Sequence, residues 1–278
     1  MDLRTKICAD PVFVIGSPRS GTSVLAWSLV QHSSGFWASN ESHILWTLFG
    51  KGHLETAFDR ARRAHSDGWL PKEGVEKQEF LGYLGLGLNA LFTNRSQGKR
   101  WIDHTPTYTR MVDTIADMFP GALFIHVLRD GREVVDSMTH FLDVPKDNLG
   151  HPPPWVDFTQ ACRTWRLNTE VAMDFCRRNP ARCITVVHKE LVSDPQDGFK
   201  RIHELLRVPH EDGPIDYFET QRINSSFRFA KVGRARTWDP CAEWSSKEKM
   251  IFYWEAGPNL LEYGLASKEE LDALVMPN

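Results

Sequence analysis

The sequence contains neither a CxxC motif nor a long apolar run. Its five cysteines include no CxxC motif and no spacing typical of metal ligands, which predicts reduced thiols in a cytoplasmic protein. The N-terminal segment MDLRTKICADPVFVIG contains an apolar run of about five residues, whereas a membrane helix needs about 20. It also lacks the apolar core of a signal peptide. We therefore expect no membrane span and a cytoplasmic location.

Acidic residues exceed basic ones only slightly. The chain has 33 Lys and Arg against 36 Asp and Glu, a net charge of −3 at pH 7. A nucleic-acid-binding surface is basic, so we expect no nucleic-acid partner. The content of 41% hydrophobic and 25% charged residues is ordinary for a globular protein. A length of 278 residues is compatible with one domain, which we expect to cover residues 1–278.

Continuous apolar runs alternate with helical patterns along the chain. Each of three short runs suits a strand buried on both faces of a parallel sheet, and each is followed by a segment with helical spacing. This alternation predicts an α/β fold of three layers, with helices on both faces of a central parallel sheet. The runs and their helices are Pro11–Ile15 with Thr22–His32, Ala122–Leu128 with Arg132–Phe141, and Cys183–Val187 with Asp197–Leu206.

Other segments divide into helical and irregular ones. Residues 143–155 contain four prolines and cannot form a continuous helix, and residues 209–237 contain few apolar residues in any period. We expect both to be loops over a site. The remaining segments with a helical pattern are Leu54–Ala64, Lys77–Phe92, Tyr108–Met118, Phe158–Arg178 and Ser246–Tyr263.

The segment GSPRSGTS, residues 16–23, joins the first strand to the first helix. Backbone N–H groups and the helix dipole make an anion site at such a junction. Gly16 and Gly21 let the backbone curl around an anion, and Arg19 adds a cation. An ordinary polar turn is the alternative, but the arginine and three hydroxyls around the turn favour an anion site. The loop lacks the lysine of the Walker pattern, which serves a nucleoside triphosphate and magnesium.

This loop resembles the 5′-phosphosulfate loop of sulfotransferases that use 3′-phosphoadenosine 5′-phosphosulfate (PAPS). The form PRSGT[ST] is similar to the branch that includes tyrosylprotein sulfotransferases and many bacterial members. A second signature, VLRDGREVVDSM, places Arg129 at a strand end and Ser137 eight residues later. In the family this pair holds the 3′-phosphate, on which an arginine and a hydroxyl can converge.

The resemblance, which runs from about Val12 to Gly264, implies a P-loop NTPase-like sulfotransferase fold. It also implies PAPS as co-substrate and 3′-phosphoadenosine 5′-phosphate (PAP) as product. WIDHTPTY carries His104 where the family usually has Lys, VVHKELVSDP carries His188 where it usually has Tyr, and KVGRARTW resembles a late basic loop over the nucleotide. The nucleotide-binding residues that it implies are Pro18, Arg19, Ser20, Gly21, Thr22, Ser23, Arg129, Ser137, His188, Lys231, Gly233 and Arg234.

Sulfuryl transfer needs a cation on the leaving oxygen and a base for the acceptor hydroxyl. Arg19 is the best candidate for the cation, and His104 could assist if protonated. In SNESH, residues 39–43, Glu41 aligns with the glutamate that acts as base in the tyrosylprotein-type branch. His43 is the rival, because other branches use His. We favour Glu41. No clustered carboxylates suggest a metal site, so we expect none.

Two competing functions and the acceptor stay open. A magnesium-dependent P-loop kinase is disfavoured by the missing Walker lysine, and a non-catalytic nucleotide-binding protein is disfavoured by the presence of candidate bases. Sugar, phenol, lipid and peptide tyrosine are all possible acceptors. We favour a small-molecule hydroxyl and leave a homodimer open.

Overall fold

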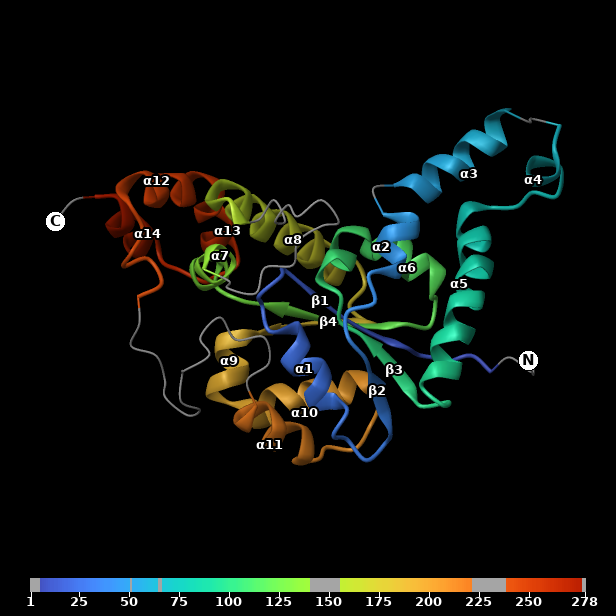
Figure 1. Cartoon of the computed structure of the whole chain (residues 1–278), viewed down its shortest axis with the longest axis horizontal. Helices are drawn as coiled ribbons and strands as arrows, with labels where there is room; N and C mark the ends of the chain where they lie inside the picture. The colour runs from blue at the N-terminus through green and yellow to red at the C-terminus, as the bar shows by residue number, and fades with distance from the viewer. Residues whose placement is uncertain (1–5, 51, 65–66, 141–155, 222–238, 277–278) are drawn as a thin grey trace.

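A five-stranded sheet forms the centre of the molecule, as a computed structural model shows for residues 6–50, 52–64, 67–140, 156–221 and 239–276 (Figure 1). The strand order is β2-β3-β1-β4-β5, and every pairing is parallel. The predicted parallel sheet is therefore confirmed. The strands are β1 (Val12–Gly16), β2 (Phe36–Ala38), β3 (Arg100–Asp103), β4 (Leu123–Leu128) and β5 (Cys183–Val187).

Strand β1 lies in the middle of the sheet and is buried on both faces. Val12 and Val14 contribute to the apolar cluster on one face, and Phe13 and Ile15 contribute to the cluster on the other. All four are at most 1% exposed. Side chains alternate between the two faces of a strand, so only a run that is apolar throughout can be buried on both sides.

Helices cover both faces of the sheet, which confirms the predicted three layers. Apolar side chains of α1, α9, α10 and α11 form the cluster that contains Val12. Those of α5, η1, α6 and α8 form the cluster that contains Phe13. Figure 1 shows α1, α10 and α11 on one side of the strands and α8 on the other. The first set is α1 (Thr22–Leu29), α9 (His188–Ser193), α10 (Pro195–Leu206) and α11 (Gly213–Thr220). The second is α5 (Lys77–Arg95), the 3₁₀ helix η1 (Pro106–Met111), α6 (Val112–Met118) and α8 (Phe158–Arg178).

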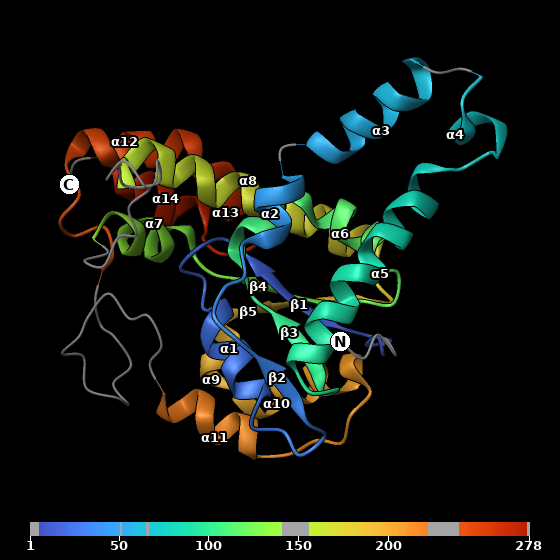
Figure 2. The same cartoon turned by 45° about the vertical axis from the view of Figure 1, so that its right-hand side comes forward.

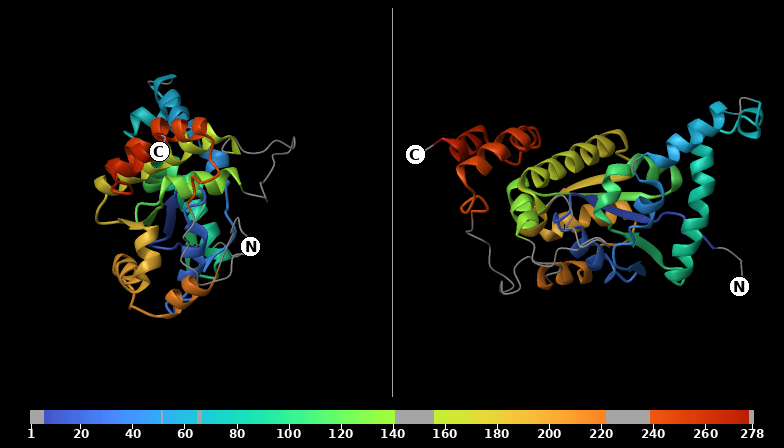
Figure 3. Two further views of the ribbon diagram at one scale, coloured as in Figure 1. Left: turned by 90° about the vertical axis from the view of Figure 1, so that its left-hand side faces the viewer. Right: turned by 45° about the horizontal axis from the view of Figure 1, so that its top comes forward.

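The C-terminal helices build a third apolar cluster beyond the sheet, around Trp165 of α8 and Phe252. Figure 3 shows them at one end of the molecule. The predicted helix Ser246–Tyr263 is interrupted, because Pro258 lacks an N–H group and lies in the first turn of a new helix that begins at Gly257. The elements here are α7 (Gly131–Thr139), α12 (Ser246–Glu255), α13 (Gly257–Glu262) and α14 (Lys268–Val275).

A helical arm connects β2 to α5. Figure 2 shows α3, α4 and the start of α5 projecting from the sheet and its covering helices. The arm begins at α2, which directly follows residues 39–43 and packs against η1. Its helices are α2 (Ile44–Phe49), α3 (His53–Ala64) and α4 (Trp69–Lys72).

Several predictions about local structure were wrong. Strands β2 and β3 were not predicted, because one has three residues and the other begins with Arg100 and ends with Asp103. The segment 209–237 was expected to be irregular, yet it contains α11. The first part of the predicted helix Tyr108–Met118 belongs to the 3₁₀ helix η1, and the α-helix begins at Val112. The predicted loop 143–155 lies outside the described residues.

The cysteines are not all reduced. Cys176, near the end of α8, and Cys183, the first residue of β5, form a disulfide across the turn between the two elements. Their Cα atoms lie 5.0 Å apart. The prediction of reduced thiols is wrong for this pair, because the turn 179–182 brings together two cysteines that lie seven positions apart and form no recognised sequence motif. Cys8, Cys162 and Cys241 are free.

Candidate active site

The phosphate loop, residues 16–23, lies between the end of β1 and the start of α1. Gly16 has a φ of +152°, and a Cβ there would lie 2.8 Å from the carbonyl oxygen of Val127. Gly21, the N-cap of α1, has a φ of +100°. A side chain is disfavoured at both positions, which explains the two glycines of the motif. Gly21 has no side chain that could cap α1, so the first N–H groups of this helix can face an anion.

Thr109 of η1 fixes the start of this loop. The N–H group of Gly16 donates to Thr109 Oγ1 over 2.8 Å, and this hydroxyl donates to the Gly16 carbonyl over 2.9 Å. Both bonds are buried. These two bonds satisfy both the N–H group and the carbonyl of Gly16. The contact with Thr109 was not predicted from the sequence. The only signal was that Thr109 directly follows WIDHTPTY.

Three of the predicted phosphate-binding residues meet beside the loop. Arg19 Nε donates to Ser137 Oγ over 3.2 Å, and Arg129 Nη1 donates to the Arg19 carbonyl over 3.0 Å. Arg129 also forms an ion pair with Glu133 at 2.8 Å. Burial, and then the charge of Arg129, lower the pKa of Arg19 to about 10. Arg19 is still protonated at neutral pH, so two neighbouring guanidinium groups create a local positive charge in an acidic protein.

His188 also lies against the loop. It is the first residue of α9, and a Cβ on Gly21 would come within 3.1 Å of its imidazole. The late basic residues Lys231, Gly233 and Arg234 lie outside the described residues. The structure therefore brings the early loop, Arg129, Ser137 and His188 together from three strand ends.

His104 connects the phosphate loop to the segment of the candidate bases. Its side chain is buried, with Nε2 at 2.9 Å from the Ser39 carbonyl and Nδ1 at 3.4 Å from Ser23 Oγ. A carbonyl oxygen only accepts, so Nε2 carries a hydrogen. His104 thus occupies the junction between the loop and residues 39–43.

Glu41 and His43, the two rival bases, lie side by side. His43 Nε2 is 3.3 Å from Glu41 Oε2, and the side chains are 55% and 31% exposed, respectively. The hydrogen bond that His43 donates to the Glu41 carboxylate raises the pKa of His43. The charge of Glu41 partly opposes the lowering of the pKa of Arg19. The structure therefore makes the two rival bases one hydrogen-bonded pair.

Comparison with known proteins places the chain in a family. A model described as the sulfotransferase family matches residues 11–212. The chain belongs to the sulfotransferase family. Protein-tyrosine sulfotransferase of Drosophila melanogaster is 23% identical over 227 residues, covering 81% of this chain and 43% of that protein. Nodulation protein NoeE of Sinorhizobium fredii is 27% identical over 210 residues, 68% of this chain and 48% of that protein.

This sulfotransferase-family chain spans about half the length of those curated relatives. A solved structure, the sulfotransferase domain of the Synechococcus PCC 7002 olefin synthase, has a TM-score of 0.51 and 21% identity, covering 78% of this chain and 80% of that one. The sulfotransferase domain from the curacin biosynthetic pathway has a TM-score of 0.50 and 18% identity, covering 81% and 82%. These likenesses support the sulfotransferase fold.

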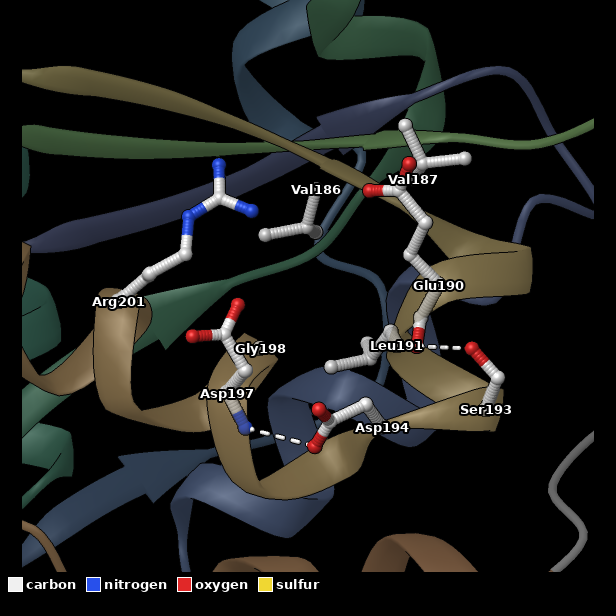
Figure 4. A pocket seen from close by; sticks show the side chains of 9 residues that line it. All are labelled: Val186, Val187, Glu190, Leu191, Ser193, Asp194, Asp197, Gly198 and Arg201. Carbon is white, nitrogen blue, oxygen red and sulfur yellow. Dashed lines mark hydrogen bonds between the residues drawn. The ribbon is translucent and has the colours of Figure 1, made fainter.

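A separate pocket of about 240 Å³ lies between α9 and α10, beside the end of β5 (Figure 4). Three carboxylates, Glu190, Asp194 and Asp197, line it together with Arg201. None of the predicted site residues lines it, so it is not part of the candidate site. Within the described ranges, no group of three or more His, Cys, Asp or Glu side chains is placed to hold a metal ion. No described helix is long and apolar enough to span a membrane.

Proposed function

We propose that this member of the sulfotransferase family transfers a sulfuryl group from PAPS to the hydroxyl group of an acceptor. The observation that carries the proposal is the meeting of Arg19, Arg129 and Ser137 at the phosphate loop, with the Glu41–His43 pair nearby. PAPS supplies the sulfuryl group, whose bond to the 5′-phosphate oxygen breaks as the acceptor oxygen bonds to sulfur.

In this proposal the residues have separate tasks. The loop N–H groups and Arg19 hold the 5′-phosphate and stabilise the charge on its leaving oxygen. Arg129 and Ser137 hold the 3′-phosphate, and their contacts with Arg19 link the two phosphate positions. Glu41 takes the acceptor proton. His43, which carries a proton more readily because of Glu41, contacts the acceptor.

A thermal-shift titration with PAP tests the donor side. A ligand that binds only the folded state stabilises it by about 2.7 kcal/mol at a hundred times its dissociation constant. Arg129→Ala should weaken PAP binding much more than binding of adenosine 5′-phosphate, which lacks the 3′-phosphate. Arg163→Ala, which removes an arginine paired with Glu255 on the C-terminal helices, is the matched control. A response to ATP with magnesium and none to PAP would support a kinase instead.

The acceptor that we propose is a small-molecule hydroxyl. A peptide tyrosine is the second candidate, favoured by the names of several curated relatives, which are protein-tyrosine sulfotransferases. Transfer of label from PAPS to phenols, sugars and tyrosine peptides, measured side by side without magnesium, separates the two. PAP binding without transfer to any acceptor class would favour a non-catalytic nucleotide-binding protein. The cytoplasmic location stays a prediction.

A further inference from the structure

Ser42, between the two candidate bases, is held by three side chains of a distant segment. Its N–H group donates to Thr105 Oγ1 over 3.0 Å, and its hydroxyl donates to Asp103 Oδ2 over 2.7 Å. The same hydroxyl lies 2.6 Å from the Tyr108 hydroxyl. Asp103 also accepts from the N–H group of Thr105 over 2.9 Å, so its two oxygens hold both sides of this contact. Asp103 is 7% exposed, which excludes most competing water.

Tyr108 completes this network by holding the start of α2. Its hydroxyl accepts from the N–H group of Leu45 over 3.0 Å. His43, the N-cap of α2, has a φ of +51° and makes no side-chain capping bond. The first N–H groups of a helix need an acceptor, and Tyr108 supplies one. The tyrosine is 1% exposed and packs against Phe13 of β1, which fixes where that acceptor lies.

Each hydroxyl group in this network can donate one hydrogen bond and accept another. Leu45 donates to Tyr108, and the single hydroxyl hydrogen of Ser42 points to Asp103. Tyr108 must therefore be the donor to Ser42. The chain of donors ends on a carboxylate, and hydrogen bonds to charged groups are the stronger kind. His43 thus lies between two hydrogen-bonded parts of the backbone, Ser42 before it and the first turn of α2 after it.

The neighbouring residue, Thr109, holds the other half of the site. It exchanges two hydrogen bonds with Gly16, where the phosphate loop begins. Adjacent residues of η1 therefore contact the segment of the bases and the phosphate loop, which are separated in the sequence by residues 24–38. We propose that η1 sets the position of the Glu41–His43 pair relative to the phosphate loop, with Tyr108 and Thr109 as positioning residues. The expected effects on rate rest on the proposed function, whereas the geometry does not.

Separate substitutions of Tyr108 and Thr109 test this assignment. Tyr108→Phe keeps the buried ring and removes the hydroxyl that holds Ser42 and Leu45. Glu41 and Asp103 are the charged groups that act on His43. When its loop loosens, the pKa of His43 should fall toward 6.5, the usual value for histidine. An NMR titration of the histidine ring protons, assigned with His43→Asn, measures this pKa without any acceptor.

Thr109→Val should produce the opposite pattern. It removes the hydroxyl that holds Gly16, so PAP affinity should fall about tenfold while the pKa of His43 stays as in the wild type. Tyr108→Phe should leave PAP affinity unchanged and lower kcat about tenfold at saturating PAPS. Tyr253→Phe, which removes a hydroxyl bonded to Asp272 in the C-terminal helices, should change neither property.

A folded Tyr108→Phe variant with the wild-type pKa at His43 would overturn the proposal, and so would equal losses of both properties in both η1 variants. If Tyr108→Phe does not fold, Ser42→Ala should lower the pKa of His43 and Ser42→Thr, which keeps the hydroxyl, should restore it. Failure to restore it would also count against the network. If no acceptor is sulfated but the pKa of His43 responds as expected, the proposed function fails and the positioning by Tyr108 stands.

Discussion

The two halves of the candidate site are held in different ways. The phosphate loop lies between β1 and α1, and its turns need the glycines at positions 16 and 21, while one distant residue, Thr109, holds its first residue. The segment 39–43 lies between a strand of three residues and a helix of six. Its contacts come from Asp103, Thr105 and Tyr108, about sixty positions later in the chain.

The difference explains why one half is readable from the sequence and the other is less so. Backbone N–H groups at a strand-to-helix junction bind anions wherever glycines allow the turn. A catalytic carboxylate has no such local rule, because its neighbours are supplied by the fold. Four predictions test this contrast, from the largest expected effect to the smallest.

Glu41→Gln should break the base half and leave the donor half intact. A general base commonly contributes 10²–10⁴-fold to the rate, and Gln is nearly isosteric with Glu but is not basic. We therefore expect a loss of roughly that size in turnover at saturating PAPS, with normal stabilisation by PAP. His43→Asn should cost less, through placement of the acceptor. Near-normal turnover of Glu41→Gln together with an inactive His43→Asn would make His43 the base.

Arg19→Ala should break the donor half without changing the base. Removal of one preorganised donor to a developing charge typically costs about 3 kcal/mol of transition-state stabilisation, or 10²–10³-fold in rate. The measurement is the rate of label transfer from PAPS at saturating concentrations. Arg163→Ala is again the control, since its partner Glu255 belongs to the C-terminal helices. A loss no larger than in this control would remove Arg19 from the proposed role.

Gly16→Ala should show that the loop depends on its own backbone. A Cβ at this position would lie 2.8 Å from the Val127 carbonyl, so strain of about 1–3 kcal/mol should appear in the free energy of unfolding. Gly87→Ala in α5 is the matched control, because a Cβ there meets no atom within 4 Å. That control should be neutral or stabilising, since Ala favours helix over Gly. Equal denaturation curves for the two variants would refute the local account.

The smallest effect concerns the ion pair of Glu41 and His43. Because the folded-state pKa of His43 is raised, its contribution to stability is present in full below about pH 6.5 and is lost as the pH rises through the folded-state value. Partly exposed pairs contribute about 0.2–1 kcal/mol. Glu41→Gln should therefore lower the free energy of unfolding slightly at pH 5.5 and not at pH 8.5. A larger loss at pH 8.5 would contradict the sign of this shift.

The sequence by itself determined the parts that depend on local pattern. Strand β5 and helix α8 have the predicted bounds. A continuous apolar run marks the strand, and an amphipathic pattern sustained over 21 residues marks the helix. The phosphate loop was predictable from its glycines and from the strand and helix on either side. Arg129 and Ser137 were predicted from a second motif, and the fold brings that motif into contact with Arg19.

Only the tertiary structure decided how distant residues meet. Strand β2 is too short to form a pattern, and it exists because β3 pairs with it in the sheet. The pairing of Cys176 with Cys183 follows from the turn between α8 and β5. Glu41 and His43 were interpreted as alternatives, and the fold places them in contact, with Asp103 and Tyr108 bonded to the residue between them. Local sequence encodes backbone preferences, whereas a side-chain hydrogen bond needs a partner whose position is set by the folded core.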